Sequence, residues 1–307
     1  MSDTKHYPVV CFGETLWDML PTGKQAGGAP MNVAYHLQKL GKSPAVISKI
    51  GYDELGKQLI ETLEAKNICT EFFQMDESKP TSTVQAEIKD GHEVVYTILN
   101  NVAWDYIGYN EELATLVSNA DYFVFGSLAT RSRQTRDTLL KLLPFAKNKV
   151  LDINLRPPFY NRNTIEMLLT HANMVKLNLA ELELITGWFS PLTSETERIQ
   201  LLKNRFALDM VVVTRGAKGA IVCKGDAFAT CKGIPVTVAD TVGSGDAFLA
   251  AIIAKTMEGA AIEEALQFAN KLAAYVTTQK GACPDYNANG ISNLFAEETA
   301  QPPVTHS

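Results

Sequence analysis

Short apolar runs and helical patterns alternate along most of the chain, and this alternation constrains the fold more than any other feature. The apolar runs are residues 7–13, 44–51, 121–128, 150–155, 172–179 and 210–216. Helical spacing of apolar residues is clearest in residues 30–41, 54–67, 246–259 and 262–278. Strands that alternate with helices form right-handed βαβ units and a mostly parallel sheet. We therefore expect residues 1–307 to form one α/β domain, with a central sheet flanked by helices.

A β-rich segment interrupts this alternation between about residues 68 and 100. It holds two runs rich in Val, Ile and Thr around Asp90-Gly91, a dipeptide typical of a tight hairpin turn. We expect a small β-sheet lid here, formed mainly by residues 68–100 together with part of residues 14–25. An unpaired edge of this lid is one place where a homodimer could form. Residues 292–307 are expected to be a flexible tail.

Composition limits the classes of function. The net charge of −6 lacks the basic surplus of nucleic-acid-binding proteins, so no nucleic-acid partner is expected. No apolar run approaches the roughly 18 residues that span a bilayer, and the N-terminal residues lack the apolar core of a signal peptide, so no membrane association is expected. The five cysteines form no C-x-x-C pair, and Cys11 and Cys223 lie in apolar runs. We expect buried thiols in a reducing, cytoplasmic environment.

The segment DTVGSGDAFLAA, residues 240–251, places small residues and an acid at the start of an apolar helix. The backbone amides of Gly243, Ser244 and Gly245 would lie at the positive end of that helix and form a cradle for an anion. Asp246 could then take a proton from a hydroxyl that attacks a bound phosphoryl group. The alternative is that Asp246 only stabilises the first helical turn, where acidic residues are favoured.

Other known motifs do not fit this segment. A dinucleotide-binding G-x-G-x-x-G would have Phe248 in place of its third glycine. A G-x-S-x-G nucleophile elbow around Ser244 would need glycines where Val242 and Asp246 stand. The chain contains neither a G-x-x-x-x-G-K-[ST] phosphate-binding loop nor an H-E-x-x-H zinc motif. These absences argue against an NAD-dependent oxidoreductase and a serine hydrolase.

Together with AGGAPMNVA at residues 26–34, the segment at 240–251 resembles the two signatures of the ribokinase-like (PfkB) carbohydrate kinase family. The resemblance runs from about Val9 to Pro284 and includes the lid hairpin. It is closest to fructokinases, through CFGETLWDMLPTG at residues 11–23, and LDINLRPPFY at residues 151–160 resembles fructokinases and their close relatives that act on keto-sugar acids. It implies a ribokinase-like fold and an ATP-dependent phosphotransferase with an alcohol group as acceptor.

The resemblance implies roles for individual residues on the substrate side. Asp246 would be the catalytic base, and the amides of Gly243, Ser244 and Gly245 would form the anion hole. Sugar contacts are expected from Asp18, Gly27, Gly28, Asn32 and Arg156.

Some of these substrate-side residues also have structural explanations. Asp18 could be a solvated loop acid, and Asn32 could simply solvate a helix end. Asp152, Asn154 and Arg156 alternate along one run and are expected on one face of a strand. Arg156 could therefore either contact the substrate or transferring phosphoryl group, or form an ion pair with Asp152.

On the nucleotide side the resemblance implies binding of ATP and Mg²⁺. ATP contacts are expected from Asn178, Thr214, Gly216, Gly219 and Asn270. Glu181 is expected near Mg²⁺, directly or through water. Asn178 and Glu181 also form a helix-capping pattern, and Asn270 could simply pack on a neighbouring loop. A K⁺ site, which the resemblance also implies, would lie near Asp240, Val242 and Gly281.

D-fructose is the substrate that the resemblance favours, with fructose 6-phosphate as the product. Ribose, tagatose or a 2-keto-3-deoxy acid are the alternative substrates. A non-catalytic sugar sensor is an alternative of another class. The presence of Asp246 beside both glycines argues against a sensor, because a sensor does not need the base.

Overall fold

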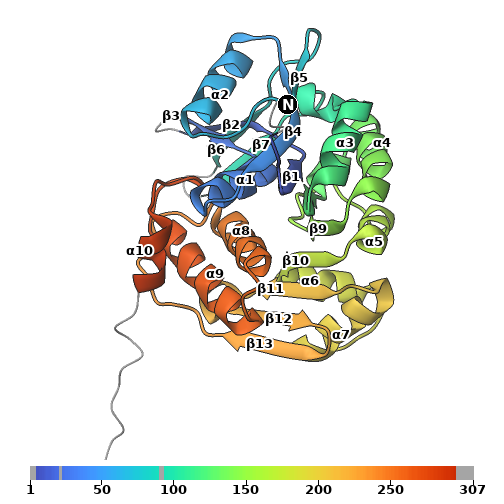
Figure 1. The fold of residues 1–307 in the computed structure, drawn as a ribbon, viewed down its shortest axis with the longest axis vertical. Helices are drawn as coiled ribbons and strands as arrows, with labels where there is room; N and C mark the ends of the chain where they lie inside the picture. Colours follow the sequence, from blue (N-terminus) through green and yellow to red (C-terminus); the bar gives the residue numbers. More distant parts are fainter. Residues whose placement is uncertain (1–4, 21–22, 90–92, 295–307) are drawn as a thin grey trace, which may run out of the picture.

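A nine-stranded sheet forms the centre of the molecule, in the order β13-β12-β11-β10-β9-β8-β1-β4-β5 (Figure 1). The computed structural model describes residues 5–20, 23–89 and 93–294. The strands of this sheet are β1 (Val9–Phe12), β4 (Pro44–Gly51), β5 (Phe73–Asp76), β8 (Tyr122–Gly126), β9 (Asn148–Asp152), β10 (Met174–Asn178), β11 (Met210–Thr214), β12 (Ala220–Lys224) and β13 (Ala227–Cys231). They pair in parallel from β5 to β11, and β12 and β13 add an antiparallel edge. The predicted α/β architecture is confirmed.

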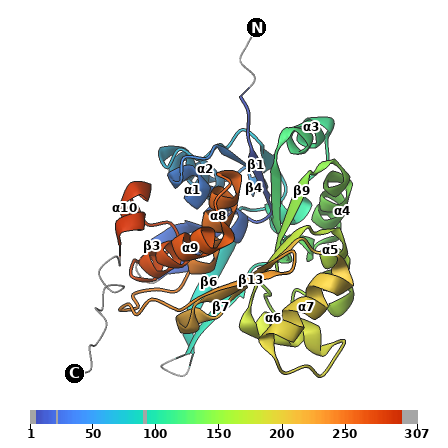
Figure 2. The same cartoon turned by 60° about the horizontal axis from the view of Figure 1, so that its bottom comes forward.

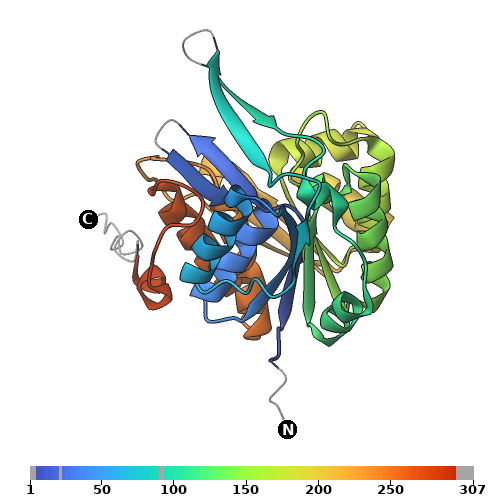
Figure 3. The ribbon, with the colours of Figure 1, turned by 90° about the horizontal axis from the view of Figure 1, so that it is seen from above.

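Helices cover both faces of this sheet (Figures 2 and 3). They are α1 (Ala29–Lys39), α2 (Glu54–Ala65), α3 (Glu111–Asn119), α4 (Arg133–Leu142), α5 (Arg162–His171), α6 (Leu179–Gly187), α7 (Glu195–Phe206), α8 (Ser244–Met257), α9 (Ile262–Thr277) and α10 (Ala288–Asn293). Short 3₁₀ turns span Ala103–Tyr106, Leu128–Thr130, Leu143–Phe145 and Gly216–Lys218. In Figure 3, α1, α2, α8 and α9 lie on one side of the sheet and α3 to α7 on the other. Within the described ranges, no helix is both long and apolar enough to cross a bilayer.

Strand β1 shows why the central strands read as continuous apolar runs. Val10 and Phe12 belong to the core beneath α3 and α4, whereas Val9 and Cys11 belong to the core beneath α1 and α8. All four side chains are buried, because successive residues of a strand point to opposite faces and both faces are covered. Cys223 on β12 is buried in the same way, and both thiols are free, as predicted.

The lid is a separate four-stranded sheet in the order β3-β2-β6-β7. Its strands are β2 (Leu16–Leu20), β3 (Gly23–Gly27), β6 (Thr83–Lys89) and β7 (Glu93–Ile98), and β6 and β7 extend away from the body of the molecule (Figure 3). The predicted lid range of 68–100 is too long at its start. Strand β5 pairs in parallel with β4 at the edge of the central sheet, because β4, α2 and β5 form one more βαβ unit. The predicted Asp90-Gly91 turn includes residues outside the described ranges.

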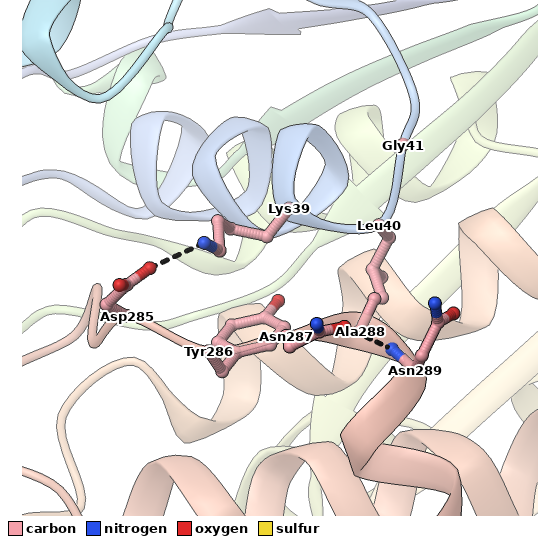
Figure 4. A pocket seen from close by; sticks show the side chains of 8 residues that line it. All are labelled: Lys39, Leu40, Gly41, Asp285, Tyr286, Asn287, Ala288 and Asn289. Atoms are coloured by element: carbon pink, nitrogen blue, oxygen red, sulfur yellow. Dashed lines mark hydrogen bonds and ion pairs between the residues drawn. The ribbon is translucent and has the colours of Figure 1, made fainter.

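Residues 281–286 return from the end of α9 and pack against α1. Tyr286 donates its hydroxyl proton to Nδ1 of the buried His36 at 3.0 Å, and Nε2 of His36 donates to the carbonyl of Ala282 at 2.9 Å. Helix α10 follows, so the tail predicted from residue 292 begins inside a helix, and its residues 295–307 lie outside the described ranges. Beside this segment a cavity of about 620 Å³ opens between the end of α1 and α10, and the Lys39–Asp285 ion pair is part of its lining (Figure 4).

The buried His36 predicts a pH-dependent stability. Burial lowers the pKa of His36 to about 4, below the value of about 6.5 expected in the unfolded chain. Neutral His36 therefore stabilises the fold above pH 6.5, and this contribution is lost as the pH falls from 6.5 towards 4. In urea denaturation, the stability advantage of the wild type over His36→Gln should shrink over that window by at most about 1.4 kcal/mol per pH unit. Parallel pH dependences of the two proteins would contradict this assignment.

Candidate active site

The two sequence signatures meet at a buried carboxylate. Asp246 lies in the first turn of α8, and Asn32 lies on α1, which packs against α8. The side-chain nitrogen of Asn32 donates to Oδ2 of Asp246 at 2.8 Å. Burial, and next the charge of Asp152, raise the pKa of Asp246 to about 6, whereas Lys176 and Arg156 oppose the rise. Asp246 is thus a carboxylate that is more basic than usual but still ionised at neutral pH.

Asn32 itself is held in one orientation from two sides. Its Nδ2 is used by Asp246, and the thiol of Cys283 donates to its Oδ1 at 3.4 Å. The amide still has one N–H to offer to a ligand. The structure therefore gives Asn32 a role in positioning Asp246, besides the sugar contact that the sequence predicts.

The start of α8 offers free backbone amides beside Asp246. Ser244 donates its amide to the carbonyl of Thr241 at 3.4 Å. The amides of Gly243, Gly245 and Asp246 have no acceptor in the described part of the chain. Such unpaired amides at a helix N-terminus bind anions. The free amides are therefore those of Gly243, Gly245 and Asp246, whereas the sequence analysis included Ser244.

Both glycines of this turn lie against neighbouring groups, and the backbone neighbour of Gly243 is the stricter constraint. Gly243 has a φ of +77°, and a Cβ atom there would lie 2.5 Å from Cα of Ala282. A Cβ atom on Gly245 would lie 2.9 Å from Nζ of Lys176. The first glycine thus lets the 281–286 segment approach the turn, and the second admits a buried ammonium group beneath it.

Lys176 is a site residue that the sequence analysis missed. It lies on β10, is 6% exposed, and its Nζ is 3.1 and 3.2 Å from the carboxylate oxygens of Asp152 on β9. Burial opposes the charge, but Asp152, followed by Asp246, holds the pKa of Lys176 above its usual value. A lysine inside a run as apolar as residues 172–179 was the available signal, because lysine is almost never buried without a partner.

The predicted sugar-side residues also come together. A Cβ atom on Gly27 would collide with Oδ2 of Asp18, and Gly28 has a φ of +115° and lies against the backbone of Glu14. Burial raises the pKa of Asp18 to about 6, and Arg156 opposes this rise. Asp18 is half-buried on strand β2 against Gly27, so it is not a solvated loop acid.

Glu14, a second residue that the sequence analysis missed, is almost fully buried after β1. Its Oε2 has no hydrogen-bond partner among the described residues. Burial raises the pKa of Glu14 to about 7, with Arg156 opposing and Asp246 adding to the rise. An acid that directly follows a buried strand was the signal in the sequence.

Arg156 does not form the ion pair with Asp152 that was one alternative for it, and the expected strand placement is wrong. Asp152 pairs with Lys176, and in the described chain Arg156 donates only to the carbonyl of Leu155, at 3.2 Å. The strand does not continue to Arg156 either, because β9 ends at Asp152 and Asn154 has a φ of +39°. Arg156 is exposed, and its charge lowers the pKa of Glu14, Asp18 and Asp246. It is thus an exposed cation whose charge acts on these acids.

The predicted nucleotide-side residues lie at the ends of adjacent strands. Asn178 ends β10 and is in register with Thr214 at the end of β11. Asn178 and Glu181 form the predicted capping box at the start of α6, with bonds of 2.9 and 2.8 Å. The other carboxylate oxygen of Glu181 accepts the amide of Leu155 at 2.8 Å. Both oxygens of this buried acid therefore already accept backbone amides.

The turn after β11 is held by internal contacts. Gly216 and Gly219 have φ values of +56° and +89°, and Gly219 lies against the backbone of residues 231–233. Arg215 donates to the carbonyls of Ala220 on β12 and Cys231 on β13, each at 3.3 Å, and pairs with Glu195 at 3.2 Å. Asn270 on α9 donates to the carbonyl of Lys232 at 2.8 Å, so it does pack on a neighbouring loop.

The residues expected near K⁺ are connected by one carboxylate. Asp240 accepts the amide of Val242 at 3.0 Å and the amide of Gly281 at 3.1 Å. This arrangement brings two backbone segments together beside Gly243. Across the described residues, no three His, Cys, Asp or Glu side chains cluster as metal ligands. A Mg²⁺ ion would therefore need phosphate oxygens and water for most of its coordination shell, as this ion commonly does.

Two glycines at opposite ends of α8 test the packing of the anion-binding turn. Gly243 and Gly259 have similar φ values, +77° and +74°, but only Gly243 has a neighbour where a Cβ atom would lie. Gly259→Ala should lose about 1–2 kcal/mol of unfolding free energy from backbone strain alone. Gly243→Ala should lose clearly more, because Ala282 must also move. Equal losses in urea denaturation would show that Ala282 does not constrain the turn.

Comparison with known proteins places this site in a family. The signature of the pfkB family carbohydrate kinases matches residues 5–289. Over 305 residues the chain is 29% identical to "probable fructokinase-7" of Arabidopsis thaliana, covering 90% of this chain and 88% of that protein. Over 268 residues it is 29% identical to a "putative sugar kinase" of Pyrococcus horikoshii, covering 84% and 83% of the two chains.

Solved structures show the same fold. An uncharacterized sugar kinase from Pyrococcus horikoshii matches with a TM-score of 0.80 and 25% identity, over 94% of this chain and 97% of that one. Fructokinase with bound ATP from Xylella fastidiosa matches with a TM-score of 0.83 and 21% identity, over 95% and 99% of the two chains. The ribokinase-like fold with its lid is confirmed. The chain belongs to the pfkB family of carbohydrate kinases, which transfer a phosphoryl group to an alcohol group of a carbohydrate.

Proposed function

We propose that the protein is an ATP-dependent fructokinase that converts D-fructose to fructose 6-phosphate, with Asp246 as the base. The observation that carries this proposal is the placement of Asp246, buried beside free amides at the N-terminus of α8 and held by Asn32 at 2.8 Å. A base and an anion-binding site side by side are what phosphoryl transfer to a hydroxyl requires.

Asp246 would remove the proton of the primary hydroxyl while that oxygen attacks the γ-phosphorus in line. A pKa of about 6 leaves the carboxylate ionised at neutral pH and makes it a stronger base than an exposed aspartate. The free amides of Gly243, Gly245 and Asp246 would stabilise the negative charge that develops on the transferred phosphoryl group. These amides are fixed before the reaction, so no reorganisation is needed at that moment.

The nucleotide would lie across the ends of β10 and β11, where Asn178 and Thr214 are adjacent. Bound Mg²⁺ supplies charge neutralisation to the phosphates. Glu181 would act towards it through water, because both of its oxygens already accept backbone amides. ATP as the donor is supported by the ATP-bound fructokinase of Xylella fastidiosa, which shares the fold.

Fructose is supported by the sugar-side residues and by the relatives. Asn32 contacts Asp246, Gly27 lies against Asp18, and the charges of Asp246 and Arg156 both act on Asp18. Several of the similar curated proteins carry the name fructokinase, at 28–29% identity. Binding of K⁺ is supported by a fructokinase double mutant of Vibrio cholerae in a fructose, ADP and potassium ion bound form, whose TM-score is 0.78, and we propose the place near Asp240 for it.

The base assignment predicts the behaviour of Asp246→Asn. Asparagine keeps the shape and can still accept from Asn32, but it cannot take the proton. We expect kcat for ADP production to fall on the order of 10²–10⁴-fold, with little change in ATP affinity. In the wild type, kcat/KM should fall as the pH drops below about 6, as Asp246 is protonated. Near-normal turnover of Asp246→Asn would rule out the base.

The substrate assignment predicts that fructose has the highest kcat/KM in an ADP-coupled panel with ribose, tagatose and a 2-keto-3-deoxy acid. A higher value for any of these would overturn fructose without affecting the base. Sugar binding without ADP production would instead favour a sensor. The panel run with K⁺ and with a non-activating cation should show higher activity with K⁺, and Asp240→Asn should weaken that difference.

A further inference from the structure

A buried ion pair lies directly beneath the anion-binding turn. The side chains of Lys176 and Asp152 are 8% and 5% exposed, and they come from neighbouring strands of the central sheet. Residue 245 is glycine and leaves room for the ammonium group, which would be 2.9 Å from a Cβ atom there. The first turn of α8 thus has a positive charge under it in addition to its free amides.

Stability alone does not explain this pair. Removing two charges from water costs several kcal/mol per ion, and replacing a buried ion pair by apolar residues is often neutral or stabilising. The surrounding strands consist largely of Val, Leu and Met, which could fill the space with apolar atoms. A charged pair at this position therefore calls for a role in the chemistry above it.

We propose that Lys176 is the buried cation of the phosphoryl-transfer site and that Lys176 and Asp152 both act through Asp246. Lys176 lowers, and Asp152 raises, the pH below which Asp246 stops working as a base. This inference rests on the proposed role of Asp246. Neither residue needs to touch the sugar, so both are positioning residues in this scheme. Lys176 adds to the field that stabilises the transferred phosphoryl group.

The charges around Asp246 come from several elements. Titratable groups that face it are Lys176 on β10, Asp152 on β9, Arg156 after β9, Glu14 after β1, Asp18 on β2 and Cys283 after α9. Of the two ion-pair partners, Asp152 raises the pKa of Asp246 and Lys176 lowers it. The pKa of Lys176 lies above its usual value, so its charge is constant through the range in which Asp246 titrates.

Opposite signs distinguish this role from a structural one. If the ion pair only held β9 and β10 together, loss of either partner would weaken the protein and leave the pH profile in place. If the pair sets the charge balance at Asp246, loss of the cation makes Asp246 easier to protonate and loss of the anion makes it harder. The acidic limb of the pH profile of kcat/KM then moves to higher pH when the cation is lost and to lower pH when the anion is lost.

The test compares Lys176→Gln and Asp152→Asn, two neutral replacements of similar size, in fructose phosphorylation between pH 5 and 8.5. The acidic limb should move to higher pH in Lys176→Gln and to lower pH in Asp152→Asn, each by on the order of one pH unit. Lys176→Gln should also lower kcat at pH 8 by on the order of tenfold or more. Asp105→Asn is the matched control, because it breaks another buried ion pair, with Arg131 at 2.7 Å, and should not move the limb.

Limbs that stay in place, or that move in the same direction in both variants, would overturn the inference. If a single variant does not fold, the double variant Lys176→Gln/Asp152→Asn leaves no buried charge unpaired. Its kcat should still be at least tenfold below the wild type, and an unchanged kcat would overturn the inference. Full activity of Asp246→Asn would show instead that Asp246 is not the base, so that the proposed function itself is wrong.

Discussion

The site depends on one hydrogen bond, from Asn32 on α1 to Asp246 on α8. It joins the first helix of the chain to the eighth and fixes the carboxylate at the positive end of α8. A carboxylate buried in this way needs partners, since burial alone disfavours its charge. Asn32 supplies a hydrogen bond, Lys176 and Arg156 supply positive charge, and Asp246 remains ionised at neutral pH although it is buried.

Several acids lie in this small region, and two cations, Arg156 and Lys176, balance their negative charge. Burial raises the pKa of Glu14, Asp18 and Asp246 together, whereas Arg156 opposes the rise in all three. Ligand phosphates would bring further negative charge to the same place. The free amides and the buried Lys176 oppose that charge from within the fold, and the exposed Arg156 opposes it from the solvent side.

Much of this fold could be predicted because its signals are local. Apolar runs predicted the central strands, and the segment 240–251 predicted a helix that begins at its glycines with the acid in the first turn. The errors concern pairings between distant segments. Strand β5 lies in the range assigned to the lid but pairs with β4, and Asp152 pairs with Lys176 across the sheet and not with Arg156, the alternative on its own run. Spacing along one strand cannot reveal a partner on the next.

By itself, the sequence determined the α/β class, the positions of the two signatures and the residue types at the anion-binding turn. Periodicity and backbone preference act over a few residues, so they are legible in a single chain. Only the tertiary structure decided which neighbour lies against each glycine, that Asn32 holds Asp246, and that a lysine lies beneath Gly245. Those facts depend on strand order and helix packing, which bring together residues far apart in the chain.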